Sequence, residues 1–76
     1  MYSIYRNGKL VGSSSDIEYV VEFTKLMVDK EISTEKDSRK LKQLYEDKLT
    51  VNSPKVGINQ LQHILARLEY SLEVAI

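Results

Sequence analysis

The chain has 76 residues, contains no cysteine and balances eleven Lys and Arg against eleven Asp and Glu. A chain this short is expected to form one domain with a thin margin of stability, and the lack of cysteine excludes disulfides and thiolate metal sites. The zero formal charge argues against strongly basic nucleic-acid binders and acidic DNA mimics. Because small domains commonly need a further source of stability, we expect a homodimer.

A β-hairpin over residues 2–13 is the first expected element. Asn7-Gly8 stands between two runs of alternating residues, and both central positions of a type I′ turn need a positive φ, which these residues tolerate. The two-residue loop sets the register. The expected pairs are Arg6 with Lys9, Tyr5 with Leu10, Ile4 with Val11, Ser3 with Gly12 and Tyr2 with Ser13.

Two partly apolar faces follow from this register. One carries Tyr2, Ile4 and Val11, and the other carries Tyr5 and Leu10. An isolated ribbon is only marginally stable, so one face should lie on the helices. The other face is either exposed or covered by a further element or partner.

The hairpin tip and its second face form the first candidate binding site. Arg6 beside Lys9 indicates an anionic partner, or else a solvated turn whose repulsion water and salt screen. Neighbours such as Tyr5 and Leu10 are typical of a contact surface, unless the ribbon packs between helices. Pairing of an exposed edge strand with a second copy would build a four-stranded sheet across a dimer.

Three helices are expected after the hairpin. Ser15 with Glu18 reads as a capping box, Ser33 or Thr34 as the cap of the next helix, and Ser53-Pro54 as a third helix start. Gly57 allows the third helix a later start, at Ile58. The expected helices cover about 16–31, 34–49 and 54–75, which gives an α+β protein of ββααα order, mainly helical.

An apolar stripe with 3-4 spacing marks the last helix. It is the core face of a small bundle or a dimer seam, and Ile64 and Ile76 widen it toward a possible partner. The stripe consists of Ile58, Leu61, Leu65, Leu68, Leu72 and Ala75.

A second candidate site lies on the same helix. His63, Arg67 and Tyr70 fall in one row on the helix. The arginine would bind a phosphate, the tyrosine ring would stack on a base, and the histidine would donate or accept a hydrogen bond. One helix face is not a pocket, so the row is either an ordinary solvent face or the wall of a nucleotide site completed at an oligomer interface, where Arg6 and Lys9 would contribute.

The nucleic-acid candidate is the basic cluster of Lys36, Arg39 and Lys40. The carboxylates of Glu46 and Asp47 follow one to two turns later, and a phosphate-tracking face should not carry its own carboxylates. Nucleic-acid binding is therefore the third reading, behind a protein partner and a nucleotide.

The sequence contains no motif for catalysis, cofactor binding or membrane insertion. No nucleophile stands at a motif spacing from a base, the single histidine cannot build a metal site, and we expect no cofactor. No targeting segment and no membrane span is visible, so we expect a cytoplasmic protein.

The opening segment MYSIYRNGKLVGSSSDIEYVV resembles the start of many small phage and prophage accessory proteins of the host-takeover or anti-defence type. The short, neutral, cysteine-free chain resembles that class as well. The resemblance implies a protein that binds and inhibits a bacterial host protein, or that sequesters a host signal, and it assigns no residue. On this reading the contact residues are Tyr5, Arg6, Lys9 and Leu10.

Overall fold

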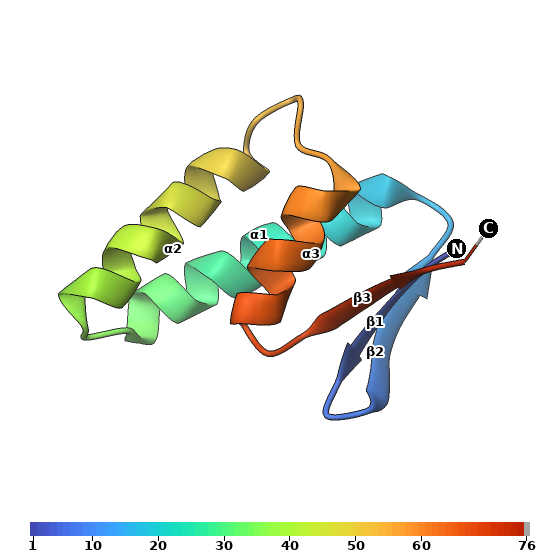
Figure 1. Cartoon of the computed structure of the whole chain (residues 1–76), viewed down its shortest axis with the longest axis horizontal. Helices are drawn as coiled ribbons and strands as arrows, with labels where there is room; N and C mark the ends of the chain where they lie inside the picture. The colour runs from blue at the N-terminus through green and yellow to red at the C-terminus, as the bar shows by residue number, and fades with distance from the viewer. Residues whose placement is uncertain (76) are drawn as a thin grey trace.

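The computed structural model describes residues 1–75 as a three-stranded antiparallel sheet with three helices (Figure 1). The sheet order is β2-β1-β3, so β1 is the central strand. The α+β class is confirmed, but the element order is β-β-α-α-α-β and includes a C-terminal strand that we did not predict. The elements are β1 (Tyr2–Arg6), β2 (Lys9–Ser14), α1 (Ile17–Thr34), α2 (Ser38–Val51), α3 (Ile58–Arg67) and β3 (Ser71–Val74).

The prediction of one helix over 54–75 is wrong at both ends. Ser53 and Pro54 form a turn, and α3 begins only after Gly57, the later start that the sequence allowed. The helix ends because Glu69 takes the left-handed conformation, with φ 70°. The Tyr70 N–H then donates to the Leu65 carbonyl at 2.8 Å, which is the hydrogen bond of a Schellman cap. The chain reverses there and runs back as β3 along β1.

The predicted turn at the hairpin tip is confirmed. Asn7 has φ 52° and Gly8 has φ 77°, as a type I′ turn requires. The two pairs next to the turn also match the prediction: Arg6 with Lys9 and Tyr5 with Leu10.

Beyond those two pairs the predicted register is wrong by one residue. A β-bulge places Ile4 opposite Gly12 instead of Val11. Val11 is therefore 46% exposed, although we expected it on the helix-facing side with Ile4, which is fully buried. Gly12 lies against the hydroxyl of Tyr19 in α1, where a Cβ would overlap it, so the bulge brings the small residue to the helix.

The cap of α1 is Asp16, not Ser15 as predicted. Its carboxylate accepts the Glu18 backbone N–H at 3.0 Å. Ser14 accepts the Asp16 backbone N–H at 3.0 Å, so the turn between β2 and α1 is already hydrogen-bonded before Ser15 is needed.

The second helix also begins later than predicted, after Asp37, whose carboxylate accepts the Arg39 N–H at 2.9 Å. Ser33 and Thr34 belong to α1, where their hydroxyls donate to the Lys30 carbonyl instead of capping the next helix. Helix α1 is thus longer than expected.

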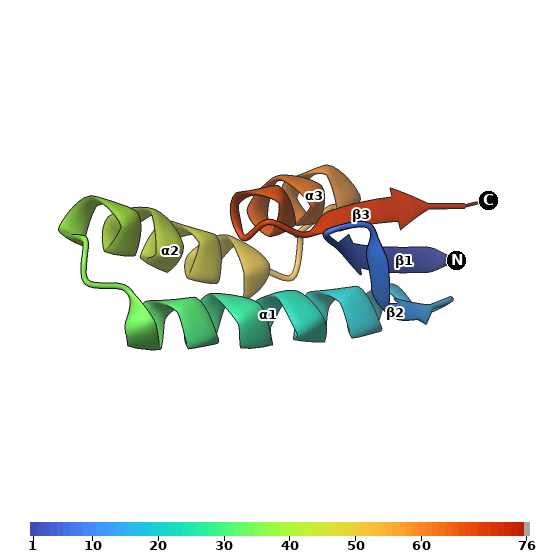
Figure 2. The same ribbon diagram turned by 90° about the horizontal axis from the view of Figure 1, so that it is seen from below.

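The core lies between the helices and one face of the sheet. Figure 2 shows α1 spanning the molecule, with α2 over one end and α3 and the sheet at the other. The stripe of α3 is a core face, and Ile64, which we considered for a partner contact, is only 2% exposed; Ile76 lies outside the described residues. The buried cluster is Ile4, Val20, Val21, Val28, Val51, Leu61, Ile64, Leu65 and Leu72.

Candidate binding surface

The sheet has one face that the helices do not cover. Residues directly opposite in neighbouring strands share a face, and the register places Leu10 and Ser71 on either side of Tyr5. Leu10 is 56% exposed and Tyr5 is half-buried, whereas Ile4 on the other face of β1 is fully buried. We call this surface the outer face; it consists of Ser3, Tyr5, Leu10, Ser13, Ser71 and Glu73.

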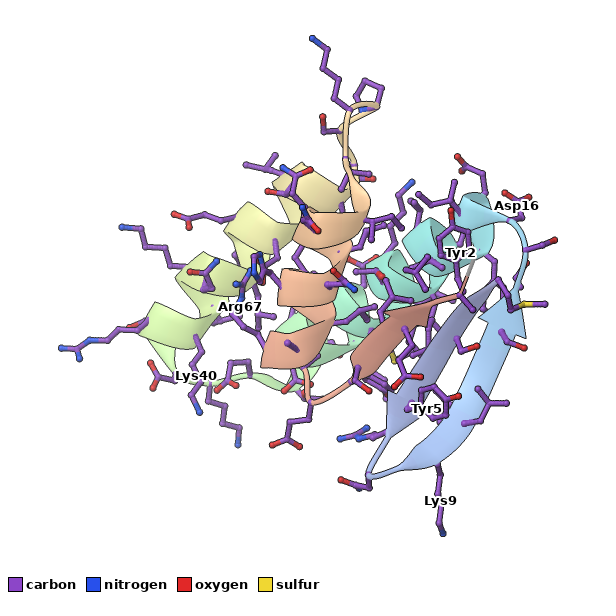
Figure 3. All side chains as sticks on the ribbon, turned by 45° about the vertical axis from the view of Figure 1, so that its right-hand side comes forward. Tyr2, Tyr5, Lys9, Asp16, Lys40 and Arg67 are labelled. Carbon is purple, nitrogen blue, oxygen red and sulfur yellow. The ribbon has the colours of Figure 1, made fainter. Side chains whose placement is uncertain are left out.

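The two cations of the hairpin tip have different surroundings. Arg6 donates to the Tyr70 hydroxyl at 3.1 Å, lies over the Tyr70 ring and is 3.8 Å from a Glu69 carboxylate oxygen. Lys9 has no carboxylate within 4.0 Å among residues 1–75 and projects away from the tip (Figure 3). Of the predicted pair, only Lys9 at the hairpin tip is therefore without an ion-pair partner among residues 1–75.

Tyr70 connects the tip to α1 through three contacts. Its hydroxyl donates to the Met27 sulfur at 3.3 Å, and its ring meets Phe23 edge-on with centroids 5.3 Å apart. The Arg6 guanidinium covers another part of the ring. The hairpin is thus attached to the helices by aromatic packing and a charge-assisted hydrogen bond, which gives the outer face a fixed position.

The predicted row of His63, Arg67 and Tyr70 does not exist as a row. The helix ends at Arg67, so Tyr70 turns toward α1, and His63 stays exposed. Arg67 donates from Nε to a carboxylate oxygen of Asp47 at 3.3 Å and from Nη2 to the other, and this carboxylate is buried. The pair joins α2 to α3 across twenty positions of sequence, and no local sequence pattern predicts it.

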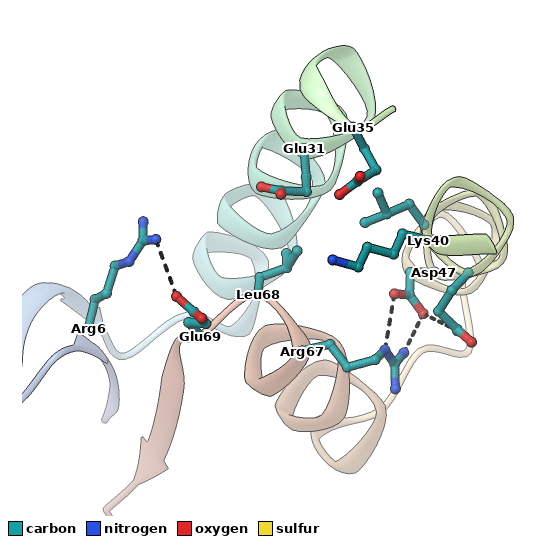
Figure 4. A pocket seen from close by; sticks show the side chains of 10 residues that line it. Arg6, Glu31, Glu35, Lys40, Asp47, Arg67, Leu68 and Glu69 are labelled. Atoms are coloured by element: carbon teal, nitrogen blue, oxygen red, sulfur yellow. Dashed lines mark hydrogen bonds and ion pairs between the residues drawn. The ribbon is translucent and has the colours of Figure 1, made fainter. Parts of the chain in front are cut away.

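A cleft of about 390 Å³ lies between the C-terminal end of α1, helix α2 and the turn from α3 to β3 (Figure 4). Lys40 reaches into it below Glu31 and Glu35. Its charged lining comprises Arg6, Lys40, Arg67, Glu31, Glu35, Asp47 and Glu69. Three cations among four carboxylates give no field that selects an anion, so the cleft is electrostatically mixed.

The three cations of the predicted nucleic-acid site do not form one surface. All three side chains are exposed, but of the three only Lys40 lines the cleft, beside Glu31 and Glu35. Phosphate contacts need cations that face one direction, and this arrangement separates them.

No family model, curated protein or solved structure matches this chain. Within residues 1–75, no three His, Cys, Asp or Glu side chains are grouped so that they could hold a metal ion. The helices of the same range include none that is long and apolar enough to cross a membrane.

Proposed function

We propose that this protein is a small non-enzymatic binding protein that inhibits a bacterial host protein by steric occlusion. The single observation that supports this is the contrast across the hairpin: Ile4 is fully buried on one face, while Leu10 is 56% exposed on the other. An apolar side chain presented on a hydrogen-bonded sheet is a common anchor of protein interfaces.

The outer face is suited to occlusion because it is preformed. Strand β1 is hydrogen-bonded to a neighbour on each side, and Tyr70 ties the tip to α1. A surface that is already ordered loses little conformational entropy on binding. In this proposal Tyr5 and Leu10 supply apolar contact, Lys9 meets a carboxylate of the target, and Arg6 holds the tip in place.

The proposal also includes the source of the protein and the compartment in which it acts. The resemblance of the first 21 residues to phage and prophage accessory proteins supports a phage-encoded protein that acts in the bacterial cytoplasm. The target is then a host protein, and the chain acts by covering it instead of modifying it.

Capture from a bacterial lysate tests the proposal. Wild-type protein should retain a partner that Tyr5→Ala and Lys9→Glu each lose, because the first removes a ring from the outer face and the second reverses the charge of the tip. Leu49→Ser is the matched control, since Leu49 is 76% exposed on α2, away from the hairpin.

The proposal fails if the two hairpin variants recover the same partners as the wild type. It also fails if Leu49→Ser loses them while the hairpin variants do not. Circular dichroism melts check that the variants are folded at the assay temperature. Lys9→Glu and Leu49→Ser should melt close to the wild type, because both side chains are exposed, and Tyr5→Ala should melt lower, because it removes a half-buried ring from the central strand.

Nucleotide sequestration is the second candidate, and one observation favours it. Arg6 and Arg67 both line the cleft, and its volume is within the range of small-molecule pockets. Four carboxylates in the same lining oppose a phosphate, which places this candidate second. A rise in melting temperature with cyclic or ADP-ribose-type nucleotides at sub-micromolar concentration would favour it over the protein target.

A further inference from the structure

The two edges of the sheet are not equivalent. At the β3 edge, α3 packs alongside the strand and the Gln62 side-chain amide donates to the Leu72 carbonyl at 3.1 Å. Strand β2 forms the opposite edge, and Figures 1 and 3 show no element beyond it. Backbone groups on the outer side of β2 therefore face solvent over a six-residue strand.

Of the features that hinder edge pairing, strand β2 has the β-bulge at Val11 and one lysine. It contains no proline and one charged residue, Lys9, at its first position. Leu10 is 56% exposed and Val11 is 46% exposed, so two adjacent apolar side chains stand at this edge. The strand is thus open, largely uncharged and partly apolar, which favours the addition of another strand.

We propose that a second copy of this chain pairs with β2 antiparallel about a two-fold axis, which joins the two sheets into one of six strands. The zero net charge of the chain supports a second copy as the occupant, because two copies have no net repulsion. This inference does not rest on the proposed target, because the outer face stays open and is extended across both copies.

The bulge makes this pairing geometrically consistent. Leu10 lies opposite Tyr5 and Ser13 lies opposite Ser3, so Leu10 and Ser13 share the outer face although they are three residues apart. Full overlap of two β2 strands places Leu10 opposite Ser13 of the second copy. Side chains that meet across an antiparallel ladder must lie on the same face, and in a strand without the bulge this pair would not.

The single charged residue of β2, Lys9, does not oppose the pairing. With full overlap, Lys9 lies opposite Ser14 of the second copy, and the two Lys9 positions are five residues apart along the ladder. That separation is about 16 Å at 3.3 Å per residue. It exceeds the screening length of about 8 Å at physiological ionic strength, so the repulsion between the lysines is small.

Six residues per strand make a small interface, and the association should be concentration-dependent. Contacts of this kind fall at or below about 1,200 Å² of total buried area, the size of weak and transient complexes. Sedimentation equilibrium of the wild-type chain should therefore show a mass that rises from 8.8 kDa toward twice that value as concentration increases.

Two valines give a matched pair of variants for this test. Val11 on β2 is 46% exposed and Val74 on β3 is 44% exposed. Val11→Lys should weaken the dimer about tenfold or more, because it places two lysines beside the axis, whereas Val74→Lys should leave it unchanged. The proposal is overturned if wild type stays at the monomer mass up to about 1 mM, or if Val74→Lys is the more disruptive variant.

Engineered thiols test the register even if a lysine variant folds poorly. The natural chain has no cysteine. The double variant Leu10→Cys with Ser13→Cys should form disulfide-linked dimers on mild oxidation. Leu10→Cys alone should not, because the two copies of position 10 lie about 10 Å apart, beyond disulfide reach. Equal cross-linking of both variants, or of neither, contradicts the pairing.

One further outcome would assign this edge to the target and not to a second copy. The chain would then cross-link in neither variant and stay monomeric, and Val11→Lys would lose a captured partner.

Discussion

Glu69 has the least favourable backbone conformation among the non-glycine residues that the structure describes. Its φ of 70° lies in the left-handed region, which costs roughly 1–2 kcal/mol for a residue with a Cβ. The nearby Arg6 offsets little of this cost, because the Glu69 side chain is largely exposed, the Arg6 side chain is about half exposed, and their charged atoms are 3.8 Å apart. The position is nevertheless required, because it turns the chain from α3 into β3.

Glu69→Gly should therefore stabilise the protein. Glycine adopts a positive φ freely, and we expect the free energy of unfolding to rise by about 0.5–1 kcal/mol after the entropy that glycine adds to the unfolded chain. Urea unfolding followed by circular dichroism measures the change, with Glu69→Ala as the control that keeps the strain. A glycine variant no more stable than the alanine variant would show that Glu69 is not strained.

At the scale of elements, Gly12 determines how β2 packs on α1. A Cβ at this position would overlap the Tyr19 hydroxyl and crowd the ring behind it. A strand interior usually avoids glycine, and a glycine there often marks a bulge or a close approach. Both readings apply here.

Gly12→Ala should lower the free energy of unfolding by about 1–3 kcal/mol, because the tyrosine must leave its position. The double variant with Tyr19→Leu removes the clashing atoms and should recover part of the loss. Thermal melts of the two single variants and the double variant measure the coupling. Additive effects would mean that the two residues do not touch.

The local signals of the sequence predict the hairpin, its turn and the existence of three helical segments. They miss β3 because the 3-4 apolar spacing of α3 continues through Leu68 and Leu72, beyond the helix end at Arg67. The end of α3 is also hard to predict, because the left-handed position after it holds Glu69, whereas glycine is the usual residue at such a position. Alternation in Ser71–Val74 was the available signal for a strand, and burial of Leu72 fits either element.

At the scale of the whole molecule, the candidate surface depends on which parts of the sequence meet in space. The pair Tyr5 and Leu10 follows from the turn alone and is found as predicted. The engagement of Arg6 by Tyr70 and the Asp47–Arg67 pair join residues 64 and 20 positions apart. Local patterns carry no information on such contacts, and for this reason the predicted ligand row on the last helix is not found.

The same contacts decide which surfaces are free to bind. They use Arg6 and Arg67 within the fold, and they leave Lys9 and the outer face of the sheet available. In the proposed function, the hairpin supplies the binding surface and the helices support it.

If lysate capture yields a partner, hydrogen–deuterium exchange of the complex measures directly whether the hairpin is the binding surface. We expect slower exchange in residues 2–14 on binding and unchanged exchange in α2, whose exposed face lies away from the hairpin. Protection confined to α2 or to the cleft, with residues 2–14 unchanged, would contradict it.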